Sequence, residues 1–184
     1  MSRPRRDFLA LTLGAGAYAA LAGSARAQQR TPAVGLIFPP LDYPIPPDAK
    51  RLYPSGVEFL GDGVGLPGGM TIEGYEEAIP RVIPIAQALV KRGANVISVF
   101  GSSLTFYKGA KFHEDLMSRV AKATGVPATT QSNGLLDGLR TVGARRVALA
   151  TAYTDVVTER LTVFLQEKCL QQCGPPRSHP LLFP

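Results

Sequence analysis

The residues best suited to chemistry follow one apolar run. Residues 95–100 are a β-branched stretch of strand length that stops at Gly101, and the hydroxyls of Ser102 and Ser103 follow at once. Ligands of open α/β sheets bind at the carboxyl ends of the strands. A Gly-Ser-Ser turn there offers backbone N–H groups and two hydroxyl donors to an anion. The alternative is an ordinary strand-to-helix turn, in which Gly and Ser serve backbone conformation and helix capping.

Metal and thiol chemistry have little support. Cys169 and Cys173 are the only cysteines, and His113 and His179 are isolated from them and from each other. A zinc site needs more ligands than this, so we expect no metal. In an oxidising compartment the two cysteines can pair, although a disulfide with three intervening residues would crosslink little of the chain. The sequence does not decide whether it forms.

The first 27 residues have the pattern of an export signal. Arg5 and Arg6 precede an apolar run over residues 9–22, and a small-x-small site follows at residues 25–27. This order predicts a twin-arginine signal over 1–27 and a periplasmic location. The apolar run is too short to span a bilayer comfortably, so we expect no stable membrane anchor after cleavage. The alternative is a basic amphipathic start of a cytoplasmic protein.

Charge argues against one class of partner. The chain has a formal net charge of +6, and much of the excess lies in the signal. The remaining charge is small and evenly spread, so nucleic acid is not an expected partner.

Apolar patterning predicts strands that alternate with helices, which is typical of a parallel α/β sheet. The expected strands are 33–38, 95–100, a short one at 128–130, and a buried one at 146–150. The expected helices are 71–92, 111–124, one capped by Ser132 that stops at Gly143, and one capped by Thr154 or Asp155.

Two stretches leave alternatives open. Residues 41–70 are rich in Pro and Gly and look like a long loop, either a functional lid or simple irregular packing. Pro80 and Pro84 are awkward inside the expected helix 71–92. That helix therefore either kinks or begins later than Thr71.

Four segments together resemble arylmalonate decarboxylase, a family of the aspartate/glutamate racemase superfamily with maleate isomerase as a close cousin. They are 35–40 (GLIFPP), 49–54 (AKRLYP), 101–110 (GSSLTFYKGA) and 145–153 (RRVALATAY). The resemblance runs from about residue 33 to 167. It implies a two-lobed racemase-like fold, with the first α/β lobe over 28–143 and the start of a second lobe over 144–168. Residues 169–184 have no periodicity, and we expect an irregular tail there, either disordered or of non-native sequence.

The resemblance also implies a site between the lobes that needs no cofactor and takes a small dicarboxylate. One carboxylate is held by hydrogen-bond donors, the other leaves as carbon dioxide from an apolar pocket, and a cysteine protonates the enediolate. The implied donors are Ser102, Ser103 and Tyr153. The implied substrate-binding residues are Pro39, Pro40, Gly101, Leu104 and Leu66. Apart from the resemblance, Tyr153 is read as a half-buried tyrosine at a strand end.

Two departures from the family pattern concern the proton donor. Gly101 stands where racemases carry their first-lobe cysteine, as it does in the decarboxylases. The second cysteine belongs to a Cys-Gly-Gly turn after a later strand, whereas Cys173-Gly174 lacks a preceding strand, so no proton donor is identified. We expect an incomplete second lobe, as a frameshift or premature stop near Lys168 would produce, and an impaired decarboxylase. The alternatives are a non-catalytic periplasmic carboxylate-binding protein, an inactive remnant, or maleate cis-trans isomerase-like chemistry. The oligomeric state is not predicted.

Overall fold

The computed structural model describes residues 31–168, 171–172 and 177–178. The expected signal over 1–27 and the two cysteines, Cys169 and Cys173, lie outside these residues. The signal and the disulfide therefore stay predictions. Within the described part of the chain, no helix is long and apolar enough to cross a membrane.

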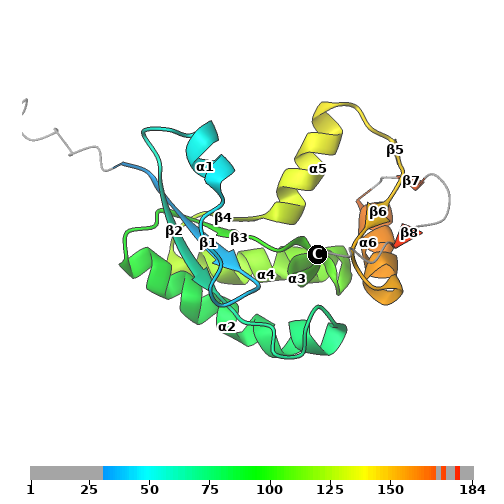
Figure 1. The fold of residues 1–184 in the computed structure, drawn as a ribbon, viewed down its shortest axis with the longest axis horizontal. Helices are drawn as coiled ribbons and strands as arrows, with labels where there is room; N and C mark the ends of the chain where they lie inside the picture. Colours follow the sequence, from blue (N-terminus) through cyan, green and yellow to red (C-terminus); the bar gives the residue numbers. More distant parts are fainter. Residues whose placement is uncertain (1–30, 169–170, 173–176, 179–184) are drawn as a thin grey trace, which may run out of the picture. The chain divides into compact units, whose positions relative to one another are not determined.

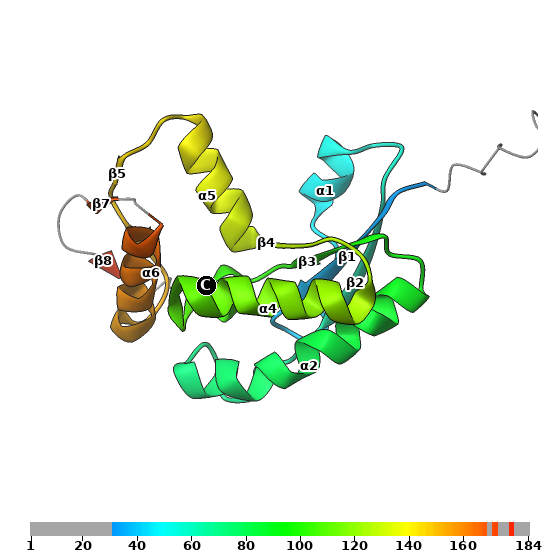
Figure 2. The same ribbon diagram turned by 180° about the vertical axis from the view of Figure 1, so that it is seen from behind.

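A four-stranded parallel sheet forms the centre of the fold (Figure 1). Its strands follow the order β2-β1-β3-β4 and have these bounds: β1 Ala33–Phe38, β2 Glu58–Gly63, β3 Val96–Val99 and β4 Ala128–Thr130. Helices α2 (Ile72–Lys91) and α4 (Gly109–Thr124) lie side by side along one face of the sheet (Figures 1 and 2). The predicted α/β class with a parallel sheet is confirmed.

Helix α2 begins directly after its N-cap residue, Thr71, as the sequence predicted. The Thr71 hydroxyl accepts a hydrogen bond from the Gly74 amide at 3.1 Å, and the helix then continues without interruption to Lys91. Pro80 and Pro84 lie within it, and both face solvent. Of the two alternatives for this segment, the start later than Thr71 is therefore wrong. The two prolines are tolerated because, on the exposed side of a helix, a backbone carbonyl that loses its amide partner can bond to water.

The segment 41–70 is not one loop. It contains the short helix α1 (Pro47–Leu52) and the edge strand β2, which pairs in parallel with the whole of β1. Glycine normally weakens a strand, but here it permits a close approach. A Cβ atom on Gly63 would lie 2.0 Å from the carbonyl oxygen of Pro40. The prediction of one continuous loop over residues 41–70 is therefore wrong, because the glycines there allow a strand to form in close contact with neighbouring backbone.

Helix α5 (Gln131–Thr141) has a different cap from the one expected. The Thr130 hydroxyl accepts from the Asn133 amide at 2.9 Å, so Thr130 and not Ser132 is the N-cap. Ser132 is the second residue of α5 and is buried. Its hydroxyl bonds with the Thr105 hydroxyl and donates to the Ser102 carbonyl. A tertiary contact has replaced the local cap that the sequence suggested.

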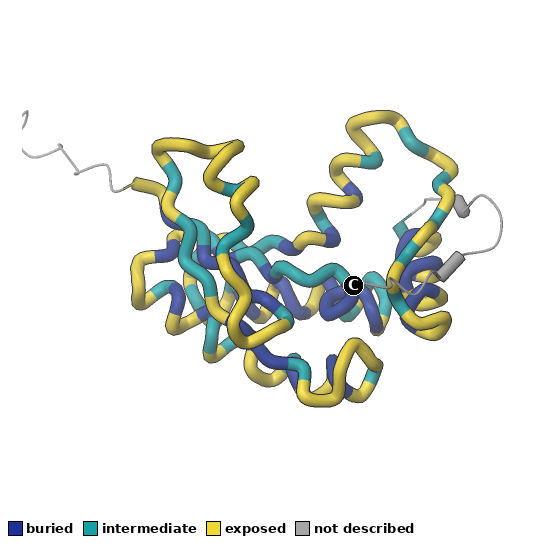
Figure 3. The backbone as a smooth tube through the Cα atoms, in the orientation of Figure 1, coloured by how far each residue is buried: buried dark blue, intermediate teal, exposed yellow. Residues whose placement is uncertain are grey.

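The stretch after α5 differs from the expected buried strand 146–150. It contains two strands of two residues, β5 (Arg146–Val147) and β6 (Ala150–Thr151), and most of this stretch is exposed (Figure 3). Each of them pairs with a two-residue strand, β7 (Gln171–Gln172) or β8 (Arg177–Ser178). The prediction of one buried strand over 146–150 is wrong. Among the described residues, β5 and β6 each belong to a sheet of only two strands, which leaves most of this apolar stretch uncovered. The lobe and tail boundaries stay predictions. The expectation that no strand precedes Cys173 is wrong, because β7 ends at Gln172.

Candidate active site

Two of the predicted donors meet across the fold. Ser102 is the first residue of α3 (Ser102–Phe106), and Tyr153 lies in the turn between β6 and α6 (Asp155–Glu167). The Ser102 Oγ and Tyr153 OH atoms are 2.8 Å apart, although the two residues are 51 positions apart in the sequence. The structure therefore brings the Ser102 hydroxyl and the Tyr153 phenol into direct contact.

Aromatic packing places Tyr153 there. Thr154 caps α6 through the Val157 amide, which resolves the choice between Thr154 and Asp155. The Phe164 ring of α6 is fully buried and lies 5.9 Å from the Phe106 ring, measured between centroids. Phe106 in turn contacts the Tyr153 ring edge-on at 5.9 Å. Aromatic contacts of this kind hold α6 and the turn before it on α3.

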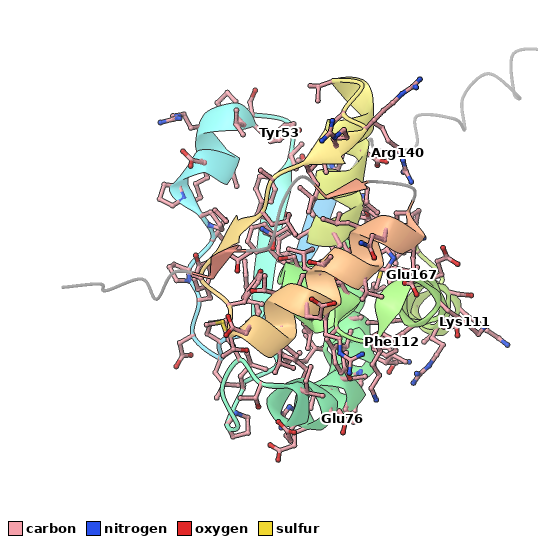
Figure 4. The ribbon with its side chains drawn as sticks, turned by 90° about the vertical axis from the view of Figure 1, so that its right-hand side faces the viewer. Tyr53, Glu76, Lys111, Phe112, Arg140 and Glu167 are labelled. Atoms are coloured by element: carbon pink, nitrogen blue, oxygen red, sulfur yellow. The ribbon has the colours of Figure 1, made fainter. Side chains whose placement is uncertain are left out.

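The other end of α6 is attached to α4. Lys108, the N-cap residue of α4, provides no side-chain cap. The carboxylate of Glu167 on α6, labelled in Figure 4, accepts from the Ala110 amide at 2.6 Å instead. Beside it, Lys168 pairs with Glu114. A carboxylate at a helix N-terminus is favourable because it meets free amide donors and the positive end of the helix dipole. Helix α6 is therefore fixed at both ends.

Ser103 and Tyr75 form the buried side of the site. Ser103 is 5% exposed and Tyr75 is fully buried. Burial raises the pKa of Tyr75, the nearby Tyr153 phenol adds to the rise, and the Ser103 hydroxyl partly offsets it. The Tyr75 hydroxyl nevertheless completes no hydrogen bond among the described residues. A buried donor without a partner is costly, and a ligand oxygen in this site would satisfy it. No sequence pattern marks Tyr75 as a donor.

The backbone of Ser102 is held by residues that the sequence analysis also missed. Its amide donates to the Gln131 side-chain oxygen at 3.1 Å. Its carbonyl accepts from the hydroxyls of Thr105 at 2.9 Å and Ser132 at 3.2 Å. No motif spacing links Gln131 to Ser102. The only available signal was topological, since β3 and β4 are neighbouring parallel strands whose carboxyl ends share one edge of the sheet.

The expected apolar residues have different environments. A Cβ atom on Gly101 would lie 2.5 Å from Cγ of Pro39, so Pro39 forms a wall directly against the turn. Pro40 is exposed. Leu104 is fully buried in the core, and Leu66 packs against that core while remaining half-buried. The predicted role of these two leucines in an apolar substrate pocket stays a prediction.

Other candidate features lie outside this donor cluster. A surface depression on α6 is lined by residues 155, 156 and 158–160 and contains none of the predicted donors. Within the described ranges, no group of three or more His, Cys, Asp and Glu side chains is arranged to hold a metal ion. His113 is buried and its Nε2 atom lies 2.8 Å from the Thr130 hydroxyl, which gives it a structural role.

Comparison with known proteins identifies the family of the chain. The family model described as arylmalonate decarboxylase matches residues 34–174. An arylmalonate decarboxylase of Bordetella bronchiseptica is 48% identical over 147 residues, which are 80% of this chain and 60% of that protein. A crystal structure of a mutant arylmalonate decarboxylase in the liganded form is 48% identical, with a TM-score of 0.76, and covers 80% of this chain and 62% of that one.

A more distant neighbour shares the fold alone. The maleate isomerase of Pseudomonas putida S16, solved with maleate, is 20% identical with a TM-score of 0.71, and covers 80% of this chain and 63% of that one. The chain thus spans about 60% of the length of the relatives that it matches. The matched family model and the identity over most of this chain show that it belongs to the arylmalonate decarboxylase family.

Proposed function

We propose that the cluster of Ser102, Ser103 and Tyr153 binds one carboxylate of an α-aryl or α-alkenyl malonate and supports loss of the other as carbon dioxide. The observation that carries this proposal is the 2.8 Å approach of the Ser102 and Tyr153 hydroxyls. The buried hydroxyl of Tyr75, which has no partner among the residues that the structure describes, supports it, because a carboxylate oxygen would give that donor a partner.

The chemistry suits hydroxyl donors. The bond between the α-carbon and the departing carboxylate breaks, and its electron pair moves onto the retained carboxylate, which becomes an enediolate. Negative charge therefore grows on the two oxygens that the donors hold. Donors that are already oriented stabilise such charge with little reorganisation. Here Ser102 is oriented by its backbone contacts and Tyr153 by ring packing.

The reaction ends only when the α-carbon receives a proton. No thiol lies beside the donors among the described residues, because the two cysteines of the chain are Cys169 and Cys173, both outside that part. We infer that the chain binds its substrate but completes the reaction slowly, because Cys173-Gly174 matches only part of the Cys-Gly-Gly turn that carries the proton donor in the family pattern. We also propose that it does so in the periplasm, on the strength of the signal pattern in residues 1–27.

The test is binding and turnover of phenylmalonate by the full chain, measured by calorimetry and by release of phenylacetate. We expect binding with little or no turnover. The Tyr153→Phe variant should bind about tenfold more weakly, since it loses a hydrogen bond to a charged group. The matched control is Tyr53→Phe, because Tyr53 is 56% exposed and its ring contacts Phe59, away from the donors.

Each result has one meaning. Failure of the unaltered chain to bind phenylmalonate refutes the proposed site. Rapid turnover that falls in Tyr153→Phe but not in Tyr53→Phe refutes the inferred impairment and establishes the decarboxylase activity. Binding with no measurable turnover favours the second candidate, a non-catalytic carboxylate-binding protein. Conversion of maleate to fumarate would instead favour isomerase-like chemistry.

A further inference from the structure

The backbone amide and carbonyl of Ser102 both form hydrogen bonds, so the side-chain hydroxyl is the group that remains able to reorient toward a ligand. The amide donates to Gln131, and the carbonyl accepts from Thr105 and Ser132. The hydroxyl lies 2.8 Å from the Tyr153 phenol. The direction in which that hydroxyl points therefore depends on how the peptide groups on either side of Ser102 are held.

Two consecutive residues of α5 hold those groups, and their environments differ. Ser132 is 1% exposed and also lies 2.8 Å from the Thr105 hydroxyl, so it belongs to the folded core. Gln131 is exposed. Its side-chain oxygen accepts a hydrogen bond from the Ser102 amide just beyond the carboxyl ends of the neighbouring strands β3 and β4. The position of Gln131 is set by the Thr130 cap, whose hydroxyl also lies 2.8 Å from the His113 ring.

An exposed side chain with one specific contact contributes little to folding. The contact of Gln131 is with the residue that supplies a predicted donor, so its effect should be visible in ligand binding. No sequence motif assigns Gln131 a role.

We propose that Gln131 is a positioning residue for the carboxylate site. Its side-chain oxygen holds the Ser102 amide, and this fixes the turn from which the Ser102 hydroxyl reaches a bound carboxylate. The inference rests on the proposed function and adds to it a residue that acts through Ser102. Gln131 itself need not touch the ligand.

The experiment compares the full chain with Gln131→Met, which keeps an unbranched side chain of similar length but lacks the acceptor. The ligand is phenylacetate, which carries one carboxylate and cannot lose it as a malonate does. We expect Gln131→Met to bind phenylacetate about fivefold more weakly, which corresponds to one ordinary hydrogen bond. Its melting temperature should stay within about 2 °C of the unaltered chain.

Two further variants separate positioning from general effects. Leu135→Met changes another exposed residue of α5 and should leave both affinity and stability unchanged. In a Ser102→Ala background, Gln131→Met should weaken binding no further, because the hydroxyl that it positions is gone. A fivefold loss that persists in that background overturns the inference, and so does equal affinity of Gln131→Met and the unaltered chain.

Amide hydrogen exchange tests the contact without a ligand. The Ser102 amide should exchange faster in Gln131→Met than in the unaltered chain, because its acceptor is lost. An unchanged exchange rate overturns the inference whether or not phenylacetate binds. If the exchange rate rises but the unaltered chain binds neither phenylmalonate nor phenylacetate, the proposed function fails, and the positioning role of Gln131 fails with it.

Discussion

Acidification should destabilise this protein through one buried histidine. His113 is 2% exposed and is packed between α4, the end of β4 and α6. Its Nε2 atom bonds with the Thr130 hydroxyl, its ring contacts Phe164 edge-on at 5.4 Å, and its Nδ1 atom has no partner among the described residues. Burial lowers the pKa of His113, Lys168 lowers it further, and Glu114 partly offsets the change.

The sign and size follow from proton linkage. The folded protein resists protonation of His113, whereas the unfolded chain takes up this proton at the ordinary pKa of about 6.5. Stability is therefore fully present above that value and is lost as the pH falls through it toward the lower pKa of the folded state. Between pH 7.5 and 5.5 the loss can reach about 1.4 kcal/mol, the limit for a histidine that stays neutral in the folded state.

Urea unfolding of the full chain at several pH values measures this loss. In His113→Gln, which can still bond to Thr130 but does not titrate, stability should change little over the same interval. His179 is present in both proteins, so its titration cancels in the comparison. Equal pH dependence of the unaltered chain and His113→Gln would refute the assignment of the effect to this buried ring.

Two further predictions concern packing. Gly101→Ala should destabilise the protein by about 1–3 kcal/mol, because the added Cβ would lie 2.5 Å from the rigid Pro39 ring. Gly138→Ala, with open space around it on α5, should instead stabilise by about 0.5–1 kcal/mol, and equal urea midpoints for the two variants would contradict the clash. Phe164→Ala should cost about 3–5 kcal/mol in urea unfolding, since it removes a fully buried ring that contacts Phe106. A loss below about 1 kcal/mol would show that α6 is not held by this contact.

Local patterns predicted most of the regular structure correctly. The apolar, β-branched runs give β1 and β3, and Thr71 marks the start of α2. These predictions succeed because strand propensity and helix capping depend on neighbours in the sequence. The edge strand β2 was not predicted, because its glycines allow a close contact with a segment distant in sequence. The buried role of Ser132 was not predicted either, because its hydroxyl bonds to Ser102, 30 positions away in the sequence.

The candidate site divides along the same line. The sequence by itself determined the Gly101-Ser102-Ser103 turn at a strand end, and its resemblance to a known family pointed to Tyr153. Only the tertiary structure decided that the Tyr153 hydroxyl reaches Ser102, that Gln131 holds the Ser102 amide, and that the buried Tyr75 hydroxyl has no partner within the described part of the chain. The physical reason is that parallel strands and docked helices join residues far apart in the chain, and a sequence pattern carries no record of those distances.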